Sequence, residues 1–203
     1  MLGRPTQARP VYYHDESVRN RPLGSFRGDF LKSPSRLCAP CNNERTQPHD
    51  LAWERMSHWL RSHRPPIRPG EFVRGDRIYP MSATQEMRNV HLYFTKLTGC
   101  HLLEAGLKFD QSALAKSILN GKPNPYIHLK FGISRSGLLL GMSDLQAATL
   151  VPDDSLAFAV WIYALEMLVI HVMYAIAGER REGLIGAWHP RTGSNRFVLA
   201  DFP

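Results

Sequence analysis

The stretch LAFAVWIYALEMLVIHVMYAIAG, residues 156–178, decides the fold. It exceeds the roughly 20 apolar residues that a helix needs to cross a bilayer. It is also rich in β-branched and aromatic residues, which favour strands. Glu166 and His171 lie near its middle, where a membrane disfavours charge. We therefore predict two buried strands that bend near Glu166, with a membrane-spanning helix as the alternative.

The segments around this hairpin carry their own helix and strand signals. Apolar stripes at helical spacing predict helices over about 50–61 and 82–105, and Asp110 with Asn120-Gly121 marks the start and end of a third. Strand patterns follow in three places: YIHLKFGI (126–133), GLLLGMSDLQAATL (137–150) and RFVLADF (196–202). Short turns between these segments indicate an antiparallel meander packed on the helices.

Composition and charge bound the class of protein. The 203 residues are 43% hydrophobic, enough for one ordinary domain or a small module joined to a larger one. Three cysteines exclude a disulfide scaffold, and the first ten residues lack the apolar segment of a secretory signal. We therefore expect a reduced, cytoplasmic protein for which a membrane partner is not expected.

The positive charge belongs to the first part of the chain. Residues 1–80 hold 14 Lys and Arg against 8 Asp and Glu, whereas residues 81–203 hold 11 against 10. Thirteen of those fourteen cations are arginine, which suits bidentate phosphate contacts. A polyanionic partner such as nucleic acid is one interpretation, and a solvated arginine-rich face is the other.

Proline divides the chain at a similar place. The run HRPPIRPGEFVRGDRIYP, residues 63–80, holds four prolines and two glycines and is typical of a connector. We therefore predict an N-terminal module over residues 1–62, a connector over 63–80, and a domain over 81–203 with two helices and an antiparallel sheet. The fold class expected for the whole chain is α+β.

The pair Cys38 and Cys41 is the most specific local feature. Two thiolates at CxxC spacing, in a turn that leads into a helix, form half of a tetrahedral zinc site. Redox chemistry and two ordinary thiols are the alternatives. Cys100 falls within a predicted helix and is expected to be a buried apolar residue.

The run LCAPCNNERTQPHDLAWERMSHWL, residues 37–60, resembles the final knuckle and helix of HNH endonuclease-like proteins of bacteria and phages. The resemblance covers about residues 12–62 and implies a small ββα-metal fold with a zinc knuckle. It makes Cys38 and Cys41 the second knuckle, places Asn42 at a metal-binding position, and makes His14, 24 residues before Cys38, the general base. The family's first CxxC and its middle asparagine have no counterpart here, which indicates a degenerate or N-terminally truncated member.

The resemblance implies two functions. In the first, the knuckle is structural and the protein binds nucleic acid, with DNA as the expected partner, through basic residues such as Arg36, Arg45 and Arg61. In the second, the chain is a metal-dependent endonuclease. Mg²⁺ or Mn²⁺ held by Asn42 and by Asp50 or His49 would polarise the phosphate, and His14 would deprotonate a water.

The C-terminal part carries no comparable motif. His91, His101, His128, His171 and His189 have no metal-ligand spacing, and the sequence lacks a phosphate-binding glycine loop and a nucleophile elbow. We expect His171 to be a hydrogen-bonded core residue. This part resembles a companion domain that follows such knuckles and has no activity assigned to it, so a protein partner is one expected role.

Overall fold

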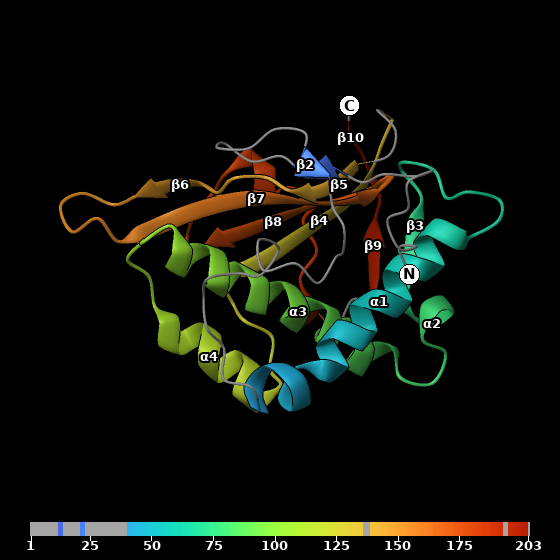
Figure 1. Cartoon of the computed structure of the whole chain (residues 1–203), viewed down its shortest axis with the longest axis horizontal. Helices are drawn as coiled ribbons and strands as arrows, with labels where there is room; N and C mark the ends of the chain where they lie inside the picture. Colours follow the sequence, from blue (N-terminus) through green and yellow to red (C-terminus); the bar gives the residue numbers. More distant parts are fainter. Residues whose placement is uncertain (1–11, 14–20, 23–39, 136–138, 193–194, 203) are drawn as a thin grey trace. The chain divides into compact units, whose positions relative to one another are not determined.

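The computed structural model describes residues 12–13, 21–22, 40–135, 139–192 and 195–202. It divides the chain into two compact units, Met1–Arg36 and Leu37–Pro203. In the first unit, strand β1 (Tyr12–Tyr13) pairs antiparallel with β2 (Arg21–Pro22). The second unit combines helices with strands, so the expected α+β class holds at this level (Figure 1).

The helices of the second unit follow the predicted apolar stripes. Trp53, Met56 and Leu60 are buried on one side of the first long helix. The Asp110 carboxylate caps the last helix by accepting from the Ala113 amide. The helical elements are η2 (Cys41–Arg45), α1 (Gln47–Ser62), α2 (Gly75–Ile78), α3 (Ala83–Glu104), α4 (Gln111–Asn120), η3 (Glu182–Leu184) and η4 (Pro190–Thr192).

The predicted hairpin is confirmed and forms the centre of a six-stranded sheet. Its strands pair antiparallel from Phe158 with Ala175 to Leu165 with Leu168, and Glu166 occupies the turn with φ +57°. Among the described residues no helix has the length and apolarity needed to cross a bilayer. The strands of the sheet are β4 (Ile127–Ser134), β5 (Leu139–Met142), β6 (Gln146–Thr149), β7 (Leu156–Glu166), β8 (Leu168–Ala175) and β10 (Ala200–Phe202).

The order of the strands corrects the predicted meander. The sheet runs β10-β4-β8-β7-β5, and β6 also pairs with β7. β4 therefore pairs with β8, although three strands separate the two in the sequence, and β10 pairs parallel with β4. β8 consists mainly of buried apolar residues, and β4 alternates buried with half-buried side chains, so neither strand is exposed and central positions suit both. The short strand β6 and the end of β5, Gly141 and Met142, are largely exposed, and both strands pair with β7 at one edge.

The core lies between this sheet and the helices. Helices α1 and α3 pack on each other and both contact β8, and α4 packs on α3, on one face of the sheet in Figure 1. The Phe94 ring of α3 meets Trp161 of β7 and Phe131 of β4 at 6.5 Å between ring centroids. Trp161 is 1% exposed, and its indole donates to the Thr98 hydroxyl. Burial of these large rings stabilises the contact between the helices and the sheet.

The segment predicted as a connector is folded into the second unit. It contains α2 and the strand β3 (Phe72–Arg74), which pairs antiparallel with β9 (Arg196–Val198). Val73 and Tyr79 are buried, and the Tyr79 hydroxyl donates to the Ala52 carbonyl of α1. Because α1 packs on α3, the helix expected within a module over residues 1–62 belongs to the unit that starts at Leu37.

Candidate nucleic-acid interface

The start of α1 holds a buried ammonium. Lys96 of α3 is 8% exposed, and its Nζ lies 2.6 Å from Oδ1 of Asp50 and 3.2 Å from Oγ1 of Thr46. The Thr46 hydroxyl in turn donates to the Asn42 carbonyl at 2.9 Å. The carboxylate that the sequence offered as a metal ligand is thus paired with a cation from a helix 46 residues further along the chain.

His49 lies beside this ion pair and is 5% exposed. Among the buried side-chain nitrogen and oxygen atoms of the described residues, only its Nδ1 has no hydrogen-bond partner. Burial, and then the charge of Lys96, lower the pKa of His49, so the ring is neutral at neutral pH. A neutral imidazole with an unused nitrogen has the chemistry of a metal ligand.

The other predicted site residues are either outside the described residues, in η2, or, in the case of Arg61, in α1. His14, Arg36 and Cys38 lie outside the described residues. Asn42 and Arg45 are exposed in η2, where Cys41 also lies, although the side chain of Cys41 is outside the description.

Arg61 has a structural partner. Its guanidinium lies 2.6 Å from the Glu166 carboxylate, and its side chain is 13% exposed. It joins α1 to the β7–β8 turn, and this pairing makes it less available to a phosphate than an exposed arginine.

The implied metals fit these residues only in part. Within residues 40–135, 139–192 and 195–202 no group of three His, Cys, Asp or Glu side chains could hold a metal ion. The Lys96 ammonium lies against the Asp50 carboxylate and would repel a divalent cation that approached the same oxygen. The Nδ1 atom of His49 is the one donor here whose environment suits a metal.

Exposed aromatic and basic side chains gather on the β3–β9 ribbon instead. Side chains of the two strands alternate, so Val73 and Phe197 are buried, and the Phe197 ring packs 4.4 Å from that of Phe131. The opposite side, which we call the ribbon face, carries the other four side chains: Phe72, Arg74, Arg196 and Val198.

The ribbon face combines charge with an open ring. Phe72 is 65% exposed, and the Arg196 guanidinium lies 5.8 Å from its ring centre. Arg74 pairs with Asp76 and still has 62% of its side chain exposed. An exposed aromatic ring beside arginines can stack on a base while the guanidinium groups contact phosphates.

Further exposed arginines extend this region over the neighbouring elements. We call the whole set the arginine surface: Arg55 of α1, Arg68 before β3, Arg74 of β3, Arg77 of α2 and Arg196 of β9. These elements contact each other in turn, α1 with α2, α2 with β3 and β3 with β9, at one end of the unit in Figure 1. Residues 54–77 hold six arginines and three acidic residues, so the positive charge there is not balanced locally.

Sequence reasoning missed this surface because it treated residues 63–80 as a connector. A signal was present: FVR (72–74) and RFV (196–198) each place one apolar residue between a cation and a second apolar residue. Phenylalanine and valine are both enriched in strands, although runs of three residues are too short to show an alternating pattern. The pairing partner lies more than 120 residues away, and a single sequence does not reveal it.

The structure also brings together three histidines that spacing alone did not connect. The His189 ring lies 4.9 Å from that of His91 and 5.3 Å from that of His128. His91 is fully buried and its Nε2 contacts the Ile127 carbonyl, while His189 uses one nitrogen on the Asn124 carbonyl and the other on the Arg191 amide.

These histidines are neutral. Burial, and then the repulsion that a protonated His189 would exert, lower the pKa of His91 to about 3, and the same two causes lower that of His128 to about 4. The nitrogens of His91 and His189 bond to the backbone, and His128 contacts His189 through its ring, so the cluster holds α3 and β4 to the segment before η4. His171, expected in a hydrogen bond, stacks instead on Phe202 of β10 at 4.1 Å between ring centroids and is half-buried.

No protein-family model, curated protein or solved structure matches this chain in the three comparisons made. The functional argument therefore depends on the residues themselves.

Proposed function

We propose that this chain binds nucleic acid without cleaving it, through the arginine surface, and that the HNH-like segment has a structural role. The observation that carries the proposal is the ribbon face, where Phe72 is 65% exposed beside Arg74 and Arg196. Single exposed apolar side chains are common, so the position of the ring beside two arginines carries the proposal rather than its exposure alone. A base could stack on the ring while the guanidinium groups bind phosphates.

The ion pair of Asp50 with Lys96 supports a non-catalytic role. A carboxylate that already balances a buried ammonium is a poor ligand for Mg²⁺ or Mn²⁺, because the metal would have to displace that ammonium. The pair instead joins α1 to α3, which suits a structural helix.

The alternative is an HNH-type endonuclease, and one observation favours it. The unpartnered Nδ1 of His49 lies at the start of α1, next to η2. A metal at this position would satisfy the nitrogen, and zinc held with Cys38 and Cys41 would stabilise the turn.

Fluorescence anisotropy with a labelled 20-base-pair duplex and the corresponding single strand tests the proposal. Replacing Arg74 and Arg196 with Gln should weaken binding at least tenfold. For the duplex, the plot of log K against log salt should become less steep by about 1.8, since each phosphate contact contributes about 0.9 to its steepness. The matched control replaces two exposed lysines at α4, Lys116 and Lys122, with Gln and should bind nearly as the wild type does. No binding at low salt, or equal losses in the two variants, would overturn the proposal.

A plasmid-nicking assay with Mg²⁺ or Mn²⁺ distinguishes the alternative. The proposal expects no cleavage by the wild type. Cleavage that disappears in His14→Ala would instead establish the endonuclease, and zinc content measured for the wild type, Cys38→Ser and Cys41→Ser would show whether the knuckle binds metal in either case.

A further inference from the structure

The ribbon face has an apolar end and a charged end. The strand register places Phe72 opposite Val198 and Arg74 opposite Arg196, and the two pairs lie two residues apart along each strand. Phe72 is 65% exposed and Val198 is 38% exposed. An apolar pair is therefore open to solvent next to a pair of guanidinium groups.

The backbone of the ribbon is fixed at both ends. The Gly70 amide donates to the Leu199 carbonyl at 2.7 Å, and the Leu199 amide donates to the Glu71 carbonyl at 3.1 Å. At the other end the Gly75 amide donates to the Asn195 carbonyl at 2.5 Å. A ring on a backbone held in this way loses little conformational freedom when a flat group stacks on it.

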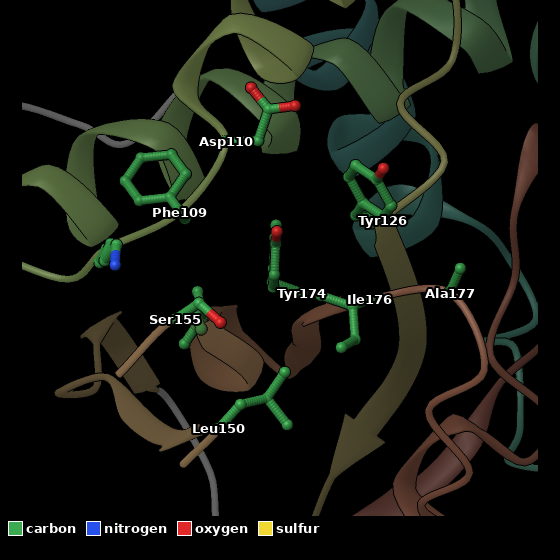
Figure 2. Close-up of a pocket in the computed structure, with 10 residues that line it drawn as sticks. Phe109, Asp110, Tyr126, Leu150, Ser155, Tyr174, Ile176 and Ala177 are labelled. Carbon is green, nitrogen blue, oxygen red and sulfur yellow. The ribbon is translucent and has the colours of Figure 1, made fainter. Parts of the chain in front are cut away.

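The aromatic rings that line a pocket of about 470 Å³ beside α4 show a different arrangement. Figure 2 shows Tyr174 with Phe109 and Tyr126 on either side, at 6.5 Å and 5.7 Å between ring centroids. Those three rings pack on one another, so the fold alone explains their contacts. Phe72 differs, because the group beside it is the Arg196 guanidinium and most of the ring surface is open.

The charges beside the open ring indicate the partner. A nucleic-acid base offers a flat face to the ring, and the phosphates next to that base can reach the guanidinium groups. Arg74 already pairs with Asp76, which lowers the gain from a phosphate bound there. A partner that also stacks on Phe72 therefore fits this face better than one that offers phosphates alone.

The single open ring favours unpaired bases. Inside a duplex every base pair is stacked on both sides, so the ring would have to enter between two base pairs as a wedge. The cost of unstacking one such step is at least comparable to the gain from one aromatic contact. A strand whose bases are already exposed avoids this cost.

We propose that the ribbon face selects single-stranded nucleic acid. One unpaired base stacks on Phe72 next to Val198, and the neighbouring phosphates bind Arg74 and Arg196. This inference rests on the proposed function and adds to it the class of nucleic acid that is preferred. The arginines contribute to the binding of either form, whereas Phe72 determines the preference.

Fluorescence anisotropy of the full chain at fixed ionic strength compares three labelled probes. They are a 15-nucleotide oligothymidylate, an abasic strand of the same length with the same phosphates, and a 15-base-pair duplex. We expect the oligothymidylate to bind about fivefold more tightly than either of the others. Because the abasic strand differs only in its missing bases, it isolates the contribution of stacking.

Two variants assign the preference to the ring. Phe72→Leu keeps an apolar side chain without the flat ring and should reduce the difference between oligothymidylate and abasic strand to less than about twofold. Leu119→Ala, which replaces an exposed leucine of α4, is the control and should keep the full difference. An undiminished difference in Phe72→Leu would overturn the assignment.

Failure of this inference can be distinguished from failure of the proposed function. Equal binding of the oligothymidylate and the abasic strand, still weakened when Arg74 and Arg196 are replaced with Gln, would overturn the single-strand preference and leave the proposed function intact. Absence of binding to all three probes would overturn both.

Discussion

The six-stranded sheet and the β3–β9 ribbon both alternate their side chains, but they use the alternation differently. In the sheet, the face toward the helices is closed, and Leu129 and Trp161 are almost fully buried there. In the ribbon, Val73 and Phe197 are buried, whereas Phe72 on the other side is 65% exposed. Burial explains this face of the sheet. It explains only half of the ribbon, and the other half is where binding is expected.

A large loss of stability is expected from a cavity on the face of the sheet that packs on the helices. Leu129→Ala should lower the free energy of unfolding by about 2–5 kcal/mol, because Leu129 is completely buried and its loss leaves a cavity. Urea denaturation measures this change. A loss below about 1 kcal/mol would mean that the sheet tolerates a cavity and would weaken the contrast with the ribbon.

Lowering the pH should reduce the free energy of unfolding through His91, which is buried between α3 and β4. Its pKa is about 3 in the folded protein and near 6.5 when unfolded, so only the unfolded chain binds a proton between these values. Stability contributed by the neutral ring is therefore complete above pH 6.5 and is lost as the pH falls toward 3, by about 2 kcal/mol at pH 5.

Urea denaturation at pH 7.5 and at pH 5 measures this loss. In His91→Gln, which keeps a donor for the Ile127 carbonyl, the drop between the two pH values should be about 2 kcal/mol smaller. An identical drop in both proteins would show that other groups cause it.

The Asp50–Lys96 pair should have a smaller and unequal effect. Asp50→Asn leaves the Lys96 ammonium buried with a weaker partner and should cost about 1–3 kcal/mol, whereas Lys96→Met replaces the charge with an apolar chain and should cost less. Thermal denaturation of both variants and the double variant compares them. The reverse order would show that Asp50, not Lys96, depends on the pair.

The smallest effect on stability is expected on the ribbon face. Phe72→Ala should change the free energy of unfolding by less than about 0.5 kcal/mol, since the ring is mostly exposed. Phe197→Ala, one strand away on the buried side, should cost about 3–5 kcal/mol. Phe72→Ala should nonetheless weaken binding to single-stranded DNA several-fold in anisotropy measurements. Unchanged binding would show that the Phe72 ring does not contribute to nucleic-acid binding.

The sequence predicted the helices and strands that are determined by residues close together in the chain. The stripe of Trp53, Met56 and Leu60 predicted α1, Asp110 predicted the cap of α4, and the change at Glu166 predicted the hairpin. Each of these signals lies within about a dozen residues. The type of each element could therefore be predicted from one sequence.

Contacts between distant segments could not be predicted in this way. The pairing of β4 with β8, the partner that Lys96 gives to Asp50, and the approach of His91 to His189 each depend on how the whole unit packs. The pairing of β3, within residues 63–80, with β9 is of the same kind, because the partner strand lies far along the chain.

The ion pair between Arg61 and Glu166 has a consequence for how the hairpin is aligned. Glu166 adopts φ +57°, a conformation in which glycine or asparagine would cost less, and its carboxylate pairs with the Arg61 guanidinium. A slip of the hairpin by one residue would turn every side chain of β7 to the wrong face and would also move Glu166 away from α1. The ion pair between α1 and the β7–β8 turn therefore forms only when the two strands pair in the native register. In any other register the Arg61 guanidinium would be nearly buried without a counter-charge.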